Sequence, residues 1–281
     1  EDCMNLFEAE KATCVLGATP FVFDILEELR QHPRDLSSLR FFLCGGTTIP
    51  PKLFEDCRPF GIRLLSIYGS TESSPHSLVR LNDTREHTEE TDGCAVDGVE
   101  IRVVDDARHE VPHGQEGEEA SRGPQVFVGY WGEPEMTARA LDADGWYYSG
   151  DYCRTDSEGR YIRITGRKKD IIVRGGENIS SREVEDIVLE YPGVREAAVV
   201  AMPDERLGER SCACVSMRPG APALHLTDLV AFFDGRRVAK YKFPEYLVVL
   251  DALPRTSSGK LQKFALARMV RERVAAGQPS D

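Results

Sequence analysis

Two short apolar runs in the sequence both stop at small residues. The first run, LRFFLCGG, ends at Gly45 and Gly46, and the second, IRLLSI, is followed by YGSTES. Between them, Pro50 and Pro51 suit the first turn of a helix that continues to about Arg58. This order predicts a βαβ unit with two parallel strands.

Parallel strands bring their carboxyl ends to one edge of a sheet, where open α/β sheets bind ligands. We therefore expect the turns at 45–47 and 68–72 to face one crevice. Glycine lets backbone N–H groups approach a phosphate, hydroxyls donate to its oxygens, and a carboxylate can hold magnesium. Taken alone, a Gly-Ser-Thr sequence is more often an ordinary turn. The candidate residues are Gly45, Gly46, Thr47, Tyr68, Gly69, Ser70, Thr71 and Glu72.

Residues 99–165 contain short β-prone runs separated by turns. VEIRVVD, QVFVGYW and RYIRIT predict strands of a small β subdomain at about 95–165. Together with the βαβ unit, it would complete a partial large α/β domain at 1–166. The carboxylate of Asp151, in YYSGD, can accept from two ribose hydroxyls or simply cap a turn.

The pattern changes after the basic segment GRKKD, and the acidic excess of the chain lies before it. A strand IIVR, a turn at Gly175 and Gly176, and a helix with capping-box spacing from Ser180 to Glu183 come first. Strands AAVVAM, CACVSM and YLVVL follow, with helices near Leu229 and after Lys263. The sequence predicts a compact α+β domain at 172–281, joined by a hinge at 167–171.

Composition narrows the class of protein. A net charge of −12 argues against a nucleic-acid-binding surface, and 41% hydrophobic residues suffice for packed cores. The longest apolar run is too short to span a bilayer and no signal segment opens the chain, so we interpret it as cytosolic. Eight scattered cysteines predict reduced thiols. Cys212 and Cys214 alternate along a strand and are expected to be small buried side chains.

Six motifs occur in one order along the chain: Gly-Gly-Thr, Tyr-Gly-Ser-Thr-Glu, Gly-Pro-x-x-x-x-Gly-Tyr, Ser-Gly-Asp, Gly-Arg-Lys-Lys-Asp and Pro-Arg-Thr-x-x-Gly-Lys. The set resembles the adenylate-forming superfamily of acyl-CoA ligases, aryl-acid adenylating enzymes and luciferases, from about residue 15 to 270. GEEASRGPQVFVGYW and VAKYKFPE look most like bacterial short- to medium-chain fatty acyl-CoA ligases, with cyclohexanecarboxylate-type ligases close by.

The resemblance implies a ligase that uses ATP and Mg²⁺ to convert a short-chain, medium-chain or alicyclic carboxylic acid to an acyl-adenylate, then transfers the acyl group to CoA. Residues 45–47 would line the adenine and acyl pocket, and Tyr68 would stack near the base. Thr71 would contact the α-phosphate and Glu72 the magnesium ion. Asp151 and Arg167 would hold the ribose.

The C-terminal domain would supply the mobile part of this site. Lys260 would bridge the attacking carboxylate and the α-phosphate, stabilising charge that grows in the transition state. The domain would rotate about Lys169 and present Arg174, Gly175 and Gly176 to the CoA thiol in its second pose.

The chain departs from the family pattern in three places. The glycine-rich phosphate loop expected upstream of Gly45 is absent, so we expect the C-terminal half of a longer ligase that requires an N-terminal half. Ser149 stands where threonine is more usual. Glu119 occupies a position that is usually apolar, which puts its strand in question.

Two alternatives stay open from the sequence. An adenylating enzyme that loads a carrier protein would need a docking face on the small domain, and a non-catalytic remnant or subunit would bind neither AMP nor CoA. A luciferase has no support beyond shared ancestry.

Overall fold

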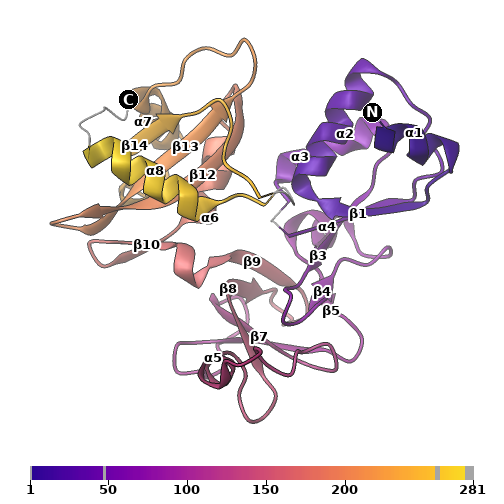
Figure 1. Ribbon diagram of the computed structural model, residues 1–281, viewed down its shortest axis with the longest axis horizontal. Helices are drawn as coiled ribbons and strands as arrows, with labels where there is room; N and C mark the ends of the chain where they lie inside the picture. The colour runs from indigo at the N-terminus through magenta and orange to yellow at the C-terminus, as the bar shows by residue number, and fades with distance from the viewer. Residues whose placement is uncertain (1, 47–48, 257–259, 276–281) are drawn as a thin grey trace. The chain divides into compact units, whose positions relative to one another are not determined.

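The computed structural model describes residues 2–46, 49–256 and 260–275 (Figure 1). The chain divides into two compact units, Glu1–Ile164 and Thr165–Asp281.

The first unit is built on a five-stranded sheet in the order β1-β2-β3-β4-β5. β1, β2 and β3 are parallel, and β4 and β5 continue the sheet in antiparallel pairing. The predicted βαβ unit is therefore present. The strands are β1 (Cys14–Ala18), β2 (Phe41–Gly45), β3 (Leu64–Tyr68), β4 (Ser77–Leu78) and β5 (Cys94–Ala95). The helices are α1 (Asp2–Ala9), α2 (Thr19–Gln31), α3 (Pro51–Cys57), the 3₁₀ turn η1 (Arg58–Phe60) and α4 (Arg85–Glu90).

Helix α2 packs on this sheet through one apolar face. Val22, Leu26 and Leu29 are buried at helical spacing, and Ile25 packs beside them, whereas Phe21 is 49% exposed. The helix starts at Thr19, with Pro20 in its first turn, and the i, i+4, i+7 row from Val22 faces the core.

A four-stranded sheet, in the order β6-β7-β8-β9, forms the predicted β subdomain. Its strands are β6 (Glu100–Val104), β7 (Gly117–Arg122), β8 (Tyr147–Thr155) and β9 (Ile162–Arg167), and α5 (Pro134–Ala140) lies before β8. The prediction of a strand at QVFVGYW is wrong. Among the described residues, Val126 forms an isolated bridge to Ser73 and the N–H of Phe127 donates to Glu72, while the Val128 and Trp131 side chains are 98% and 99% exposed. In the part of the chain that the structure describes, no strand pairs with this β-prone run.

The second unit has its own sheet, β11-β10-β13-β12, with β14 parallel to β13. Its strands are β10 (Ile171–Arg174), β11 (Glu177–Ser180), β12 (Val194–Asp204), β13 (Gly208–Met217) and β14 (Tyr246–Val249). Its helices are η2 (Lys168–Asp170), α6 (Ser181–Leu189), α7 (Leu226–Gly235), η3 (Lys240–Lys242) and α8 (Lys263–Ala275). The predicted strands and helices of this region are all present, and β11 is an addition.

The two faces of this sheet carry separate apolar clusters. Ala213 and Val215 pack with α6 and α7, whereas the alternate residues Cys212 and Cys214 pack with Leu266 of α8. A strand points successive side chains to opposite faces, so β13 is buried on both. The predicted burial of the two cysteines is confirmed, and both are free thiols.

The capping prediction for α6 is also confirmed. Ser180 is the N-cap residue, and its Oγ accepts from the backbone N–H of Glu183 at 3.4 Å. The same hydroxyl donates to the carbonyl of Thr165 at 2.8 Å, which ties the start of α6 to the end of β9.

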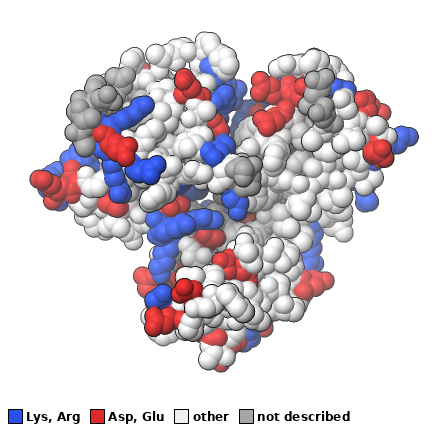
Figure 2. Space-filling model, viewed as in Figure 1, with Lys and Arg blue, Asp and Glu red and all other residues white. Residues whose placement is uncertain are grey.

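Acidic and basic side chains are interspersed on the face of each unit that Figure 2 shows. Within the described ranges, no helix is long and apolar enough to cross a bilayer. The same ranges contain no group of three or more His, Cys, Asp or Glu side chains arranged to hold a metal.

Candidate functional site

The two predicted small-residue turns begin at the same edge of the first sheet. β2 ends at Gly45 and β3 at Tyr68, and the two strands pair in parallel with Cys44 opposite Ser66. A Cβ at Gly45 would lie 2.7 Å from the carbonyl oxygen of Ile67, so only glycine permits this approach of the strands. Gly46 has a φ of 83°, in the left-handed region. Thr47 lies outside the described residues.

The turn after β3 folds back on itself. The N–H of Ser70 donates to the carbonyl of Ser73 at 2.9 Å, and the N–H of Ser73 donates to Oγ of Ser70 at 3.2 Å. A Cβ at Gly69 would lie 3.2 Å from the Ser73 carbonyl oxygen, so the turn is also tight around its glycine. This fold leaves Thr71 exposed and Glu72 partly exposed.

Glu72 is held by a tyrosine from a later motif. Its Oε1 accepts from the hydroxyl of Tyr130 at 3.0 Å, and its carbonyl accepts from the N–H of Phe127 at 2.7 Å. Partial burial raises the pKa of the Glu72 carboxyl, but hydrogen bonds from its own N–H and from Tyr130 outweigh burial and lower the pKa below 4.5. The carboxylate is therefore ionised near neutral pH.

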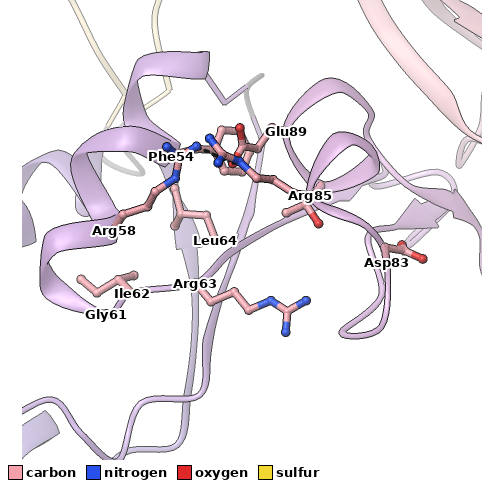
Figure 3. Close-up of a pocket in the computed structure, with 10 residues that line it drawn as sticks. Phe54, Arg58, Gly61, Ile62, Arg63, Leu64, Asp83, Arg85 and Glu89 are labelled. Atoms are coloured by element: carbon pink, nitrogen blue, oxygen red, sulfur yellow. Dashed lines mark hydrogen bonds and ion pairs between the residues drawn. The ribbon is translucent and has the colours of Figure 1, made fainter.

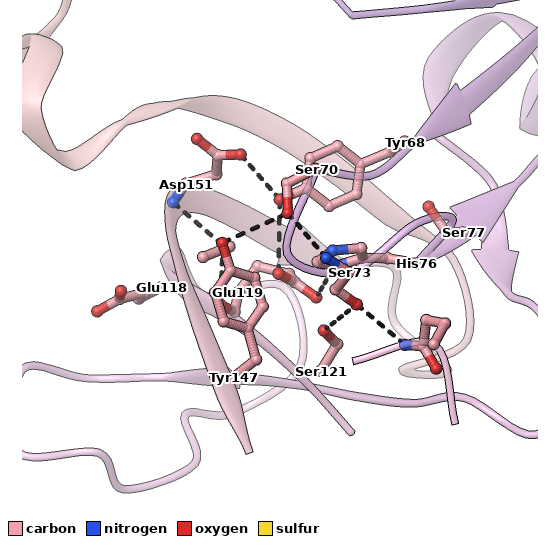
Figure 4. Close-up of polar contacts among 12 residues, drawn as sticks. Tyr68, Ser70, Ser73, His76, Ser77, Glu118, Glu119, Ser121, Tyr147 and Asp151 are labelled. Atoms are coloured by element: carbon pink, nitrogen blue, oxygen red, sulfur yellow. Dashed lines mark hydrogen bonds and ion pairs between the residues drawn. The ribbon is translucent and has the colours of Figure 1, made fainter. Parts of the chain in front are cut away.

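Tyr68 and Asp151 meet although 83 positions separate them in the chain. The Tyr68 hydroxyl donates to Oδ2 of Asp151 at 2.9 Å (Figure 4). Ser149 supports the arrangement, because its Oγ accepts from the N–H of Asp151 at 3.1 Å and donates to the carbonyl of Glu119 at 2.9 Å. Burial, together with the charges of Glu119 and Asp151, raises the pKa of Tyr68 well above 10, so its hydroxyl remains a donor.

Behind Tyr68 lies a buried pair that sequence reasoning missed. Nδ1 of His76 is 2.8 Å from Oε1 of Glu119, and both side chains are 0% exposed. The doubtful strand around Glu119 is present as β7, because the carboxylate has a partner 43 residues away. The unusual glutamate was visible in the sequence, but nothing in it identified His76 as the partner.

The remaining candidate residues belong to the second unit. Lys260 is exposed, and its backbone exchanges two hydrogen bonds with Thr256: Thr256 N–H to the Lys260 carbonyl at 2.8 Å, and Lys260 N–H to Oγ1 of Thr256 at 3.0 Å. Residues 257–259 lie outside the described part of the chain. Arg167 ends β9, and Lys169 lies in η2.

The Gly175-Gly176 turn has left-handed backbone at both positions, with φ of 60° and 91°. Arg174, just before it, is held by Glu245 through two hydrogen bonds of 2.9 Å, from Nε and from one terminal nitrogen. Because the guanidinium of Arg174 is bound by Glu245 of the same unit, Arg174 has a structural role at the base of the turn.

A surface hollow of about 370 Å³ lies elsewhere in the first unit (Figure 3). It adjoins Leu64 at the amino end of β3, opposite to the end that carries Tyr68. Two of the arginines that line the hollow are paired with Glu89, which accepts hydrogen bonds from Arg58 at 2.6 Å and from Arg85 at 2.9 Å. None of the predicted site residues lines this hollow.

Comparison with known proteins gives consistent matches. The chain is 63% identical to the medium-chain fatty-acid–CoA ligase of Escherichia coli K12, over 97% of this chain and 48% of that protein. It is 38% identical to a feruloyl-CoA synthase of Amycolatopsis, over 94% of this chain and 53% of that protein. The crystal structure of ATP-bound MatB from Rhodopseudomonas palustris superposes with a TM-score of 0.89 at 30% identity, covering 96% of this chain and 53% of that one.

The chain therefore spans about half the length of these relatives. Residues 1–131 match the family model of the AMP-binding enzymes, and residues 183–260 match that of the AMP-binding enzyme C-terminal domain. On these matches over both units, the chain belongs to the adenylate-forming superfamily.

Proposed function

We propose that this chain provides the nucleotide-binding turn and the mobile lysine of an ATP-dependent ligase that joins a medium-chain carboxylic acid to CoA. The observation that carries the proposal is the meeting of Tyr68 with Asp151 at the carboxyl end of β3. The identity of 63% to a medium-chain fatty-acid–CoA ligase supports the substrate class.

The residues of the first unit fit a nucleoside phosphate. Tyr68 offers an aromatic ring beside the Asp151 carboxylate, a pairing that suits a base and a ribose. Gly45 and Gly46 leave the carboxyl end of β2 without side chains, so a flat base could approach the backbone there. The hydroxyls of Ser70 and Thr71, with the N–H groups of the turn that begins at Gly69, suit the α-phosphate.

Glu72 fits a magnesium ion shared with the nucleotide. Its carboxylate is ionised near neutral pH, and magnesium is usually held by one or two carboxylates together with substrate phosphates. Such an ion would offset negative charge on the phosphates. Tyr130 orients the carboxylate from the side, through the hydrogen bond to Oε1.

In the first half-reaction, a carboxylate oxygen of the acid attacks the α-phosphorus of ATP, pyrophosphate leaves, and an acyl-adenylate forms. Lys260 would place its ammonium between the carboxylate and the α-phosphate oxygens, where negative charge grows. In the second half-reaction, the thiol of CoA attacks the acyl carbonyl carbon, loses its proton, and AMP leaves.

The second unit would serve both steps in turn. We assign residues 1–166 to the large domain, 167–171 to the hinge and 172–281 to the mobile domain, with Lys169 as the pivot and Arg167 as a ribose contact. Gly175 and Gly176 would line the thiol path, with Arg174 fixing the base of their turn through Glu245.

Calorimetric titration of the full chain with AMP, and separately with CoA, tests this proposal. We expect saturable binding of AMP at one site per chain, and stronger CoA binding once AMP is present. A chain that binds neither ligand is a non-catalytic remnant, and the proposal is then wrong. If the chain binds AMP but not CoA, and binds a pantetheinylated carrier protein instead, then the carrier protein replaces CoA as the acyl acceptor in the proposal.

A further inference from the structure

Two ionisable side chains, His76 and Glu119, are completely buried beside the proposed nucleotide site. Charged groups are seldom buried to this extent unless they are paired, because leaving water costs them much free energy. Nε2 of His76 has no hydrogen-bond partner in the described part of the chain. The polar contact of this imidazole therefore runs through Nδ1 to Glu119.

The pair contacts Tyr68 at two points (Figure 4). Oε2 of Glu119 lies 3.4 Å from the Tyr68 hydroxyl, and the imidazole of His76 packs edge-on against the Tyr68 ring with centroids 4.9 Å apart. The contact with Glu119 restrains the hydroxyl end of Tyr68, and the contact with His76 restrains the plane of its ring. An apolar residue at position 119 would supply neither the charge nor the acceptor.

The Tyr68 hydroxyl has one proton and two carboxylates within reach. Oδ2 of Asp151, 2.9 Å from the Tyr68 hydroxyl oxygen, is the nearer acceptor, and Oε2 of Glu119 lies 3.4 Å from the same oxygen. Two carboxylates around one hydroxyl repel each other. Nδ1 of His76 lies 2.8 Å from the other oxygen of Glu119, where a proton on Nδ1 would offset that repulsion. The Tyr68 hydroxyl therefore lies between the carboxylate of Asp151 and that of Glu119, which contacts His76.

We propose that His76 and Glu119 are positioning residues that fix the Tyr68 ring and keep its hydroxyl on Asp151, so that base and ribose are bound at a set spacing. This inference rests on the proposed function, because it assigns the base to Tyr68 and the ribose to Asp151. It predicts that removing the His76–Glu119 pair lowers the affinity for AMP only by the share that the ribose hydroxyls contribute.

The test compares AMP with 2′,3′-dideoxyadenosine monophosphate, which offers Asp151 no hydroxyl. The double variant His76→Phe/Glu119→Leu replaces the buried pair by apolar groups, a change that cores often tolerate. We expect it to bind AMP about tenfold more weakly, as for one lost hydrogen bond to a charged group, and to bind the dideoxy analogue as the wild type does. Glu119→Gln keeps an acceptor and should bind AMP within about twofold of wild type.

Tyr68→Phe keeps the buried pair and should show the same AMP-specific loss, which tests the inference even if the double variant does not fold. Tyr161→Phe is the matched control, since the Tyr161 hydroxyl donates to Asp83 at 2.7 Å elsewhere in the same unit. It should lower the melting temperature without changing either affinity.

Wild-type affinity for AMP in Tyr68→Phe or in the folded double variant would overturn the inference, and so would an equal loss for both nucleotides. Failure of the wild-type chain to bind any adenine nucleotide would instead overturn the proposed function, and the inference with it.

Discussion

Arg255 and Glu196 form an ion pair in which a guanidinium nitrogen lies 2.5 Å from Oε1, at the base of the loop that carries Lys260. Glu196 belongs to β12 and also accepts from Oγ of Ser216 on β13 at 2.9 Å. Arg255 is bridged to Leu261 across the loop. The pair therefore connects Arg255, and through its bridge Leu261, to the sheet of the second unit.

This pair predicts a loss of stability in acid. Burial raises the pKa of Glu196, but hydrogen bonds from Arg255 and Ser216 outweigh it, so the folded-state pKa lies below 4.5. A depressed folded pKa stabilises the fold above the unfolded value and loses that contribution as pH falls through the folded value. Glu196→Gln should cost about 1–2 kcal/mol at pH 7.

Thermal unfolding of wild type and Glu196→Gln between pH 7 and pH 3 measures this effect. The gap between their melting temperatures should narrow once the pH drops below about 4.5. A gap of constant size over that whole range would show that the ionisation of Glu196 contributes nothing.

Gly45→Ala should destabilise the first unit. Its Cβ would lie 2.7 Å from the Ile67 carbonyl oxygen and 2.9 Å from Cγ2 of Ile67, so β2 and β3 would have to separate. Forcing a methyl group into such a site costs about 1–3 kcal/mol. Gly235→Ala is the control, because a Cβ there meets nothing within 4 Å. Urea unfolding should show a loss only for Gly45→Ala, and equal midpoints for both variants would contradict this account of the strand edge.

Lys260→Ala should separate the two half-reactions. Its ammonium is assigned to the charge that grows at the α-phosphate, and loss of such a group costs about 10²- to 10³-fold in rate. The assay would use this chain co-expressed with the part of the Escherichia coli ligase that it does not match. We expect adenylate formation to fall by that factor while CoA still reacts with supplied acyl-adenylate.

Lys242→Ala provides the comparison, because Lys242 pairs with Glu183 at 2.5 Å on the same unit. It should leave both rates unchanged. If Lys260→Ala slowed both half-reactions equally, Lys260 would have no special role in the first.

The elements of the fold that repeat a simple pattern could be predicted from the sequence. β2 and β3 are short apolar runs that end in glycine-rich turns, and α6 has a serine cap with glutamate three residues later. QVFVGYW shows where such reasoning fails, because strand propensity cannot say whether a partner strand is available.

The site was predictable only as separate motifs. Tyr68, Glu72 and Asp151 could be named from their turns, but their contacts depend on partners 51 to 83 residues away. Glu119 shows the limit best. A glutamate at an expected apolar position is conspicuous, yet whether it disrupts a strand or pairs with a buried histidine is decided by the tertiary fold.

The AMP affinity of Asp151→Asn tests the proposed position of the nucleotide. It would be measured by calorimetry beside that of Asp144→Asn, since Asp144 is an exposed aspartate of the same subdomain. Loss of the Asp151 charge should weaken AMP binding by about tenfold or more, as for a hydrogen bond to a charged group, while Asp144→Asn should bind as the wild type does. Wild-type affinity in Asp151→Asn would contradict the placement of the nucleotide between Tyr68 and Asp151.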